Sequence, residues 1–209
     1  PAMMLFLLLS LVMSLATGNL VAATLWPLPS DRLLRELAVR WLLAAVVGFA
    51  SASLSTFIWL HLQPGTLTAL ATIDFLLLAS AWWWWQRAQK PKSSKAQKPE
   101  IGTSQLAKVL LGLALLASST AVLVHEGLLI HQRPHGHWDA PAIWNLKARF
   151  FFRGGEYWTD MFTSHLDWTR PDHPPLLPLN VARWWQYGGG ESTLVPALTG
   201  VALTILIAA

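Results

Sequence analysis

The chain has 209 residues, of which 54% are hydrophobic and 12% are charged, and its formal net charge is +4 at pH 7. The apolar residues stand in long blocks, so we expect an all-α, polytopic membrane protein with no separate soluble domain. Nucleic acid is not an expected partner, because five of the fifteen Lys and Arg residues lie in one short tract between apolar blocks. The absence of cysteine excludes disulfides, thiolate metal sites and cysteine nucleophiles.

Four apolar blocks in residues 1–130 are long enough for helices that cross a hydrocarbon core of ~30 Å. The first block follows no basic residues and is too long for the apolar part of a signal peptide, so a membrane helix fits it better than a cleaved leader. Together the blocks predict a four-helix N-terminal transmembrane region with spans at residues 3–26, 41–62, 66–85 and 105–130.

The C-terminal region, residues 176–209, contains two shorter apolar stretches, the first of which begins at residue 174. Residues 174–187 fit a re-entrant helix, an interfacial helix or a short span, with Arg183 and the adjacent tryptophans as anchors at the end. Residues 193–209 read as a further transmembrane helix cut short by the chain end, so we expect an N-terminal fragment that is inactive alone. The total prediction is about five or six membrane helices.

Basic residues predict which side of the membrane each loop occupies. The loop at 87–100 carries one arginine and four lysines, and the connection before residue 41 carries three arginines. Two spans separate these loops, so both can lie in the cytoplasm, as the positive-inside rule requires. The fourth span then delivers residues 131–175 to the opposite, outer face.

Residues 131–175 form an outer loop that concentrates polar and aromatic side chains, including five of the seven histidines. Asp139 followed by proline predicts a helix start, and a Gly pair at 154–155 predicts its end, so we expect an amphipathic helix at 141–153. Asn145 and Arg149 share one face of this helix at i, i+4. We expect the helix to lie flat on the bilayer with its aromatic residues in lipid and its cations near phosphates.

Two acids fall inside or near the ends of predicted spans. Carboxylates in such places are candidates for function, because their burial in lipid costs several kcal/mol. Glu126 lies close to the outer end of the fourth span and can reach an outer cavity. For Asp74 in the third span, a protonated or helix-paired structural residue is at least as good an interpretation as a catalytic one.

Metal binding is a second interpretation of the histidines in the outer loop. His131, His135, His137 and the nearby Asp139 are nitrogen and oxygen donors. Their spacing matches no closed structural zinc pattern. A divalent ion held by acids beside a phosphate is the stronger of the two metal hypotheses.

The order of features in residues 122–209 resembles the first outer loop of the membrane-embedded GT-C glycosyltransferases, which include protein O-mannosyltransferases and aminoarabinose transferases. An acid follows the outward span at Trp138-Asp139-Ala140, and the stretch AIWNLKARFFFRGGEYW supplies an amphipathic helix that ends in glycine. The motif Asp172-His173-Pro174-Pro175-Leu176 then precedes a helix, a Gly break and an acid.

This resemblance implies transfer of a sugar from a polyprenyl-phosphate carrier to an acceptor at the outer, periplasmic face of a bacterial inner membrane. Asp139 corresponds to the loop acid that deprotonates the acceptor or helps to bind a metal ion, and Asp172 and His173 stand near the donor phosphate. Substrate-binding candidates are Trp138, Lys147, Arg149 and Glu126. Direct in-line attack on the sugar predicts inversion at the anomeric carbon.

Two alternatives stay open from the sequence. One is a non-enzymatic membrane module, such as part of a transporter or an assembly factor, whose outer loop is a docking surface. The other is an outer-face enzyme of different chemistry, such as a ligase or polymerase of lipid-linked glycans. An enzyme requires Asp139 and Asp172 to face one cavity, whereas a transporter requires Asp74 and Glu126 along one path through the bundle.

Overall fold

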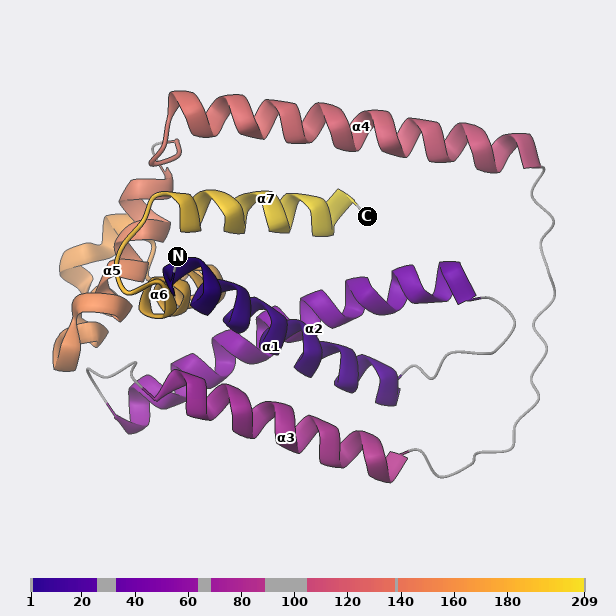
Figure 1. Cartoon of the computed structure of the whole chain (residues 1–209). Coiled ribbons are helices and arrows are strands. Elements are labelled where there is room, and N and C mark those ends of the chain that lie inside the picture. Colours follow the sequence, from indigo (N-terminus) through magenta and orange to yellow (C-terminus); the bar gives the residue numbers. More distant parts are fainter. Residues whose placement is uncertain (1, 26–32, 64–68, 89–104, 138, 209) are drawn as a thin grey trace.

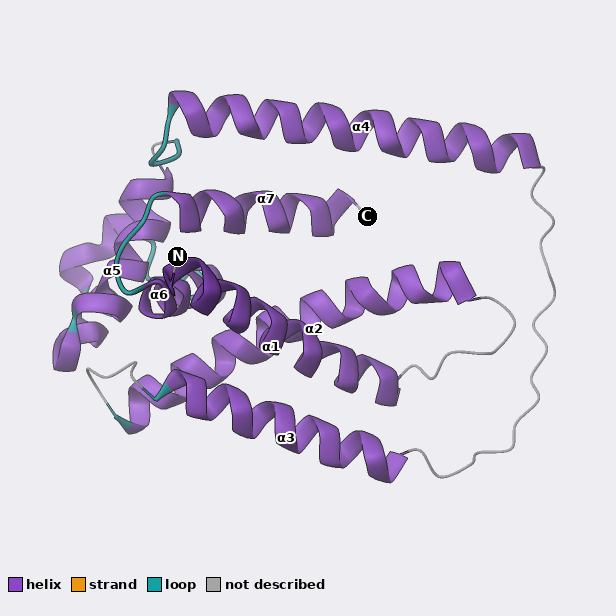
Figure 2. Cartoon of the chain, viewed as in Figure 1, coloured by secondary structure: helices purple, strands orange, loops and turns teal. Residues whose placement is uncertain are grey.

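The computed structural model describes residues 2–25, 33–63, 69–88, 105–137 and 139–208. Within these ranges every regular element is a helix, and the expected all-α class is confirmed (Figures 1 and 2). The elements are α1 (Ala2–Leu25), α2 (Leu33–Leu62), α3 (Leu70–Ala88), α4 (Gln105–Gln132), the π-helical turn η1 (Ala140–Trp144), α5 (Asn145–Arg153), the 3-10 helices η2 (Gly155–Phe162) and η3 (Ser164–Thr169), α6 (Leu176–Gly188) and α7 (Leu194–Ala208).

Three of the described helices are long and apolar enough to cross a membrane, at Leu8–Leu25 in α1, Val39–Leu62 in α2 and Gly112–Gln132 in α4. Helix α3 does not meet the same standard, because four tryptophans and a Gln-Arg pair fill its last turns. Part of the third predicted span, residues 66–68, lies outside the described residues. Helix α7 offers a shorter apolar stretch at Leu194–Thr204.

The long helices alternate in direction, so that their ends gather at two opposite sides of the molecule. At one side are the last turn of α1, the first turn of α2, the last turn of α3 and the first turn of α4 (right in Figure 1). At the other side lie the last turn of α2, the end of α4, and α5 and α6 (left in Figure 1). The predicted outer-loop helices therefore share one end of the bundle.

Helices α1 and α2 approach each other closely through two glycines. A Cβ atom built on Gly18 would clash with the carbonyl oxygen of Ala44, and one built on Gly48 would clash with the backbone of Ser14. Only a residue without a side chain lets two helix backbones come this near. The glycines therefore fix the crossing of α1 and α2.

Helix α6 is held inside the bundle by polar contacts. Asp74 in α3 forms an ion pair with Arg183 and accepts a hydrogen bond from Tyr187, and Arg183 and Asp74 are 1% and 3% exposed. Asn180 donates to Ser53 Oγ in α2 at 2.5 Å. The helix-paired interpretation of Asp74 is confirmed.

The end of α6 does not serve as an interfacial anchor in the way the sequence suggested. Arg183 is paired inside the bundle, and Trp185 is 2% exposed and donates from Nε1 to the Ser192 carbonyl at 2.9 Å. Trp184, which lies between them in the sequence, is half-buried and makes an edge contact with Phe49. Arg183 and Trp184 therefore contact α3 and α2 in place of the lipid headgroups that the sequence predicted.

Helix α5 ends where the sequence predicted, but it begins at Asn145 instead of residue 141, after the π-helical turn η1, and its environment differs from the predicted one. It ends at Arg153 with Gly154 at the C-cap, and Gly155 has a φ of 58°, as the Gly pair predicted. Its expected exposure of aromatic residues to lipid is wrong for Phe151, which is 2% exposed and packs in a core with Trp158 and Leu179. The helix packs on α6 and η2, because those elements cover the face that the sequence assigned to lipid.

Candidate functional site

A cavity of about 280 Å³ lies where the end of α4, the turn η1 and the start of α7 meet, and polar side chains line part of its mainly apolar wall. Glu126 and Arg133 come from α4 and the residues just after it, and Asn145 begins α5. Glu126, which the sequence placed close to the end of the fourth predicted span, lines this cavity. The lining residues are Glu126, Leu129, Ile130, Arg133, Pro134, His135, Gly136, His137, Ala140, Asn145, Pro196, Ala197 and Gly200.

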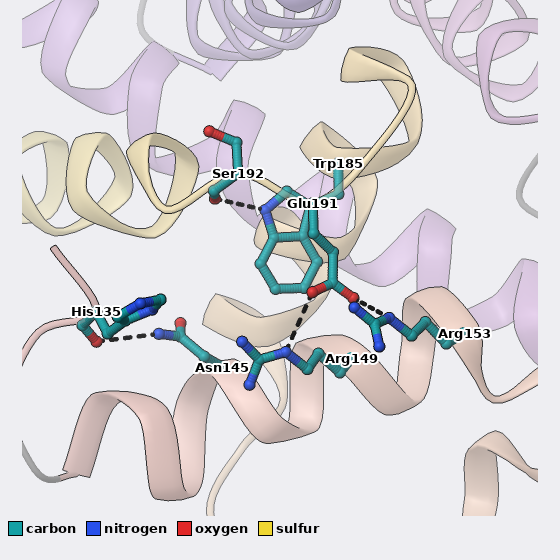
Figure 3. A network of polar contacts seen from close by, with 7 residues as sticks. All are labelled: His135, Asn145, Arg149, Arg153, Trp185, Glu191 and Ser192. Atoms are coloured by element: carbon teal, nitrogen blue, oxygen red, sulfur yellow. Dashed lines mark hydrogen bonds and ion pairs between the residues drawn. The ribbon is translucent and has the colours of Figure 1, made fainter.

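A second cavity, of about 180 Å³, adjoins the first and shares Pro134, His135, Asn145 and Pro196 with it. Arg149 and Glu191 line this second cavity. Figure 3 shows Arg149 with its Nε toward Glu191 and its terminal nitrogens on the side of Asn145. The predicted shared face of Asn145 and Arg149 is therefore the face of α5 that lines this cavity.

Glu191 connects α5 to the segment that leads into α7. Its carboxylate accepts from Arg149 Nε at 3.1 Å and forms an ion pair with Arg153 (Figure 3). The Glu191 side chain is 17% exposed, whereas that of Arg153 is 65% exposed. Glu191 accepts from Nε of Arg149, and among the described residues no acceptor is recorded for the two terminal amino groups of the planar guanidinium.

An apolar cavity of about 280 Å³ lies beyond Ser192, which lines both it and the second cavity. It is bordered by α1, α6 and α7, with Leu8, Leu11, Trp184, Gly188, Gly190, Ser192, Leu194, Val195, Leu198 and Ala202 around it. The second cavity thus shares lining residues with the first cavity on one side and with the apolar cavity on the other. This arrangement suits a ligand with a charged head and a hydrocarbon tail.

Asp139 is not among the residues that line the first cavity. His137 and Ala140, which flank it closely in sequence, both line that cavity. Asp139 occupies the N-cap position of η1, as predicted, but its side chain makes no capping hydrogen bond and is exposed. A capping hydrogen bond therefore does not account for the carboxylate.

Lys147 has a different position from the one its expected role in substrate binding requires. Its side chain is fully buried, and Nζ donates to the carbonyl oxygens of Arg170 at 2.5 Å and His173 at 3.5 Å. Burial lowers the pKa of the Lys147 ammonium, and the nearby Asp172 carboxylate partly opposes this shift. In this structure Lys147 holds the 170–173 turn against α5.

Asp172 and His173 lie together in that turn, and neither lines the first cavity. The Arg170 guanidinium donates to Asp172 at 3.3 Å and holds the pKa of its carboxyl group below the usual value. His173 stacks on Trp144 with 5.5 Å between ring centroids. Neither Asp139 nor Asp172 lines any of the three cavities described above, so these cavities do not show the convergence of the two carboxylates that an enzyme requires.

The metal hypothesis finds no donor set in the part of the chain that the structure describes. No group of three or more histidine or acidic side chains there is arranged to hold a metal ion. His135 and His137 line the first cavity together with a single acid, Glu126. Trp138, the indole expected beside Asp139, lies outside the described residues.

Two residues of this site were missed by sequence reasoning. Arg133 follows the fourth predicted span directly, and a cation at a span end usually indicates only topology. Glu191 was noted as the acid after a Gly break, but its partners are 42 positions away in the chain, at Arg149, and nearly as far at Arg153. No family model, curated protein or solved structure matches the chain.

Proposed function

We propose that the protein is a membrane glycosyltransferase, or the N-terminal part of one, that moves a sugar from a polyprenyl-phosphate carrier to an acceptor hydroxyl. The observation that carries the proposal is the group of three adjoining cavities at the start of α7, where arginine and acidic side chains line two cavities and apolar side chains line the third. An isoprenoid phosphate sugar combines a polar sugar and an anionic phosphate with a hydrocarbon tail, and the proposal places these parts in the three cavities.

In the proposed reaction Asp139 is the general base. Its carboxylate takes the proton of the acceptor hydroxyl while the acceptor oxygen bonds to the anomeric carbon. The bond from that carbon to the carrier phosphate breaks, and the phosphate leaves with the bonding electrons. Attack from the side opposite the phosphate inverts the anomeric centre.

Cations near the second cavity would stabilise the departing phosphate. Arg149 has two terminal amino groups that Glu191 does not occupy, and Arg133 adds a further positive charge in the adjoining cavity. Asp172 and His173 remain candidates for the donor side, with Arg170 as the cation beside them. No step of this proposal uses a metal ion.

The membrane arrangement is part of the proposal. We propose that α3 and α7 cross the membrane together with α1, α2 and α4, which gives five spans, and that α6 packs within the protein. The cavities then face the outer side of a bacterial inner membrane, with the lysine-rich tract at 87–100 in the cytoplasm. The transport alternative is less favoured, because Asp74 is engaged by Arg183 and Tyr187 and not presented along a path with Glu126.

The test is sugar transfer from radiolabelled polyprenyl-phosphate sugars in membranes that contain the full-length protein. We expect Asp139→Asn to lower the transfer rate by about 10²–10⁴-fold, because the amide cannot accept the proton. Asp160→Asn is the control, since Asp160 is also exposed and lies on η2, outside the cavities. Equal rates for Asp139→Asn and the unaltered protein would contradict the assignment.

A further inference from the structure

The guanidinium of Arg183 has donors that the protein leaves unused in the bundle interior. The residue is 1% exposed, and one terminal nitrogen forms the ion pair with Asp74. Its Nε and its other terminal nitrogen are buried and have no acceptor among the described residues. A buried N–H without an acceptor is strongly unfavourable, so these donors require a partner.

A small cavity adjoins this guanidinium. It has a volume of about 10 Å³ and lies between α1, α2, α3 and α6. Ser14 on α1 lines it, is 9% exposed, and has a buried Oγ that is likewise without a hydrogen-bond partner. The lining residues are Met13, Ser14, Thr17, Gly48, Ser51, Ala52, Asp74, Leu77 and Arg183.

We propose that this cavity binds one water molecule, which accepts a hydrogen bond from Arg183 and bonds to Ser14 Oγ. The volume is close to one water-sized probe sphere, and the walls supply the two to four polar partners that a buried water needs. A bound anion fits poorly, because Asp74 already neutralises Arg183 and leaves no net positive charge. A cation is repelled by the guanidinium.

The water would join elements that have no direct polar bond at this point. Ser14 belongs to α1, and Arg183 belongs to α6, which supports α5 and the start of α7. The bound water therefore extends the α3–α6 ion pair into a junction of three helices. This inference is independent of the proposed glycosyltransferase activity.

The direct test is an experimental structure of the whole chain at a resolution that reveals ordered water. We expect a discrete density peak within hydrogen-bonding distance of an Arg183 nitrogen and of Ser14 Oγ. A well-defined interior without such a peak, or an Arg183 guanidinium turned onto a protein acceptor, would overturn the proposal.

A matched pair of variants tests the same site by thermal unfolding in detergent. Ser14→Ala removes a partner of the water, and we expect the melting temperature to fall by about 2–4 °C. Ser10→Ala is the control, since Ser10 is also fully buried on α1 with an unpartnered Oγ but does not line the cavity. We expect Ser10→Ala to leave the melting temperature unchanged or higher; a Ser14→Ala variant with the same behaviour would also overturn the proposal.

Discussion

Three charged side chains, Asp74, Lys147 and Arg183, are almost entirely buried, and each is engaged by groups distant in the chain. Asp74 and Arg183 neutralise each other, while Lys147 donates to two backbone carbonyls. Burial of a charge is tolerated only with partners of this kind. At the scale of single residues, these contacts tie α3 to α6 and the 170–173 turn to α5.

We predict that Asp74→Asn destabilises the protein severely. The amide leaves the Arg183 guanidinium buried without a counter-charge, which costs about 3–5 kcal/mol of unfolding free energy. Thermal or denaturant unfolding in detergent measures the loss, with the exposed Asp167→Asn as control. The double variant with Asp74→Asn and Arg183→Met should lose less unfolding free energy than the two single variants lose together, since the two residues act as a pair. Additive losses would contradict the pairing.

Helix contacts differ sharply between the two sides of the bundle. Helices α1 and α2 meet at Gly18 and Gly48, where any added Cβ meets backbone. Helix α4 is the opposite case, because none of its candidate span Gly112–Gln132 is buried within the protein. At the scale of elements, small residues are therefore essential in α1 and α2 and not in α4.

Substitution of alanine for glycine should therefore destabilise the protein in α2 and stabilise it in α4. Gly48→Ala forces α1 away from α2, and we expect a loss of about 1–3 kcal/mol. Gly112→Ala adds a Cβ that meets nothing within 4 Å, so the higher helix propensity of alanine should stabilise α4 by up to about 1 kcal/mol. Unfolding in detergent compares the variants, and a Gly48→Ala protein as stable as Gly112→Ala would contradict the close packing.

At the scale of the whole molecule, the three cavities described above are lined by residues at the start of α7 and from α5, α6 or the end of α4. Figure 1 shows these helix ends on one side of the bundle. The lysine-rich tract joins α3 to α4, whose ends lie at the opposite side. A bilayer between the two sides would separate the cavities from the basic tract. The function proposed above depends on this separation.

Cysteine labelling can test the sidedness without background, because the chain contains no cysteine. We expect Ser164→Cys, at an exposed position of η3, to react with a membrane-impermeant maleimide on intact bacterial cells with a permeabilised outer membrane. Ser93→Cys, in the basic tract, should react only after the inner membrane is opened. The reverse pattern, or equal labelling of both, would contradict the outer location of the cavities and with it the use of a lipid-linked donor there.

The sequence by itself determined the helical class, the presence of the long apolar helices and the last residue of α5. These features follow from local causes: hydropathy over about twenty residues and glycine after a last turn. The sequence also indicated the pairing of Asp74 as an alternative to catalysis, because a carboxylate inside a span needs a partner.

Only the tertiary structure decided which side chains meet. Glu191 reaches Arg149 and Arg153, Asp74 reaches Arg183, and Lys147 turns inward to the 170–173 carbonyls. An amphipathic pattern gives the direction of an apolar face but not what covers it. Phe151, for which the sequence predicted contact with lipid, therefore packs against Trp158 and Leu179. Contacts between residues tens or more than a hundred positions apart depend on how helices pack, and no local pattern in one sequence specifies that packing.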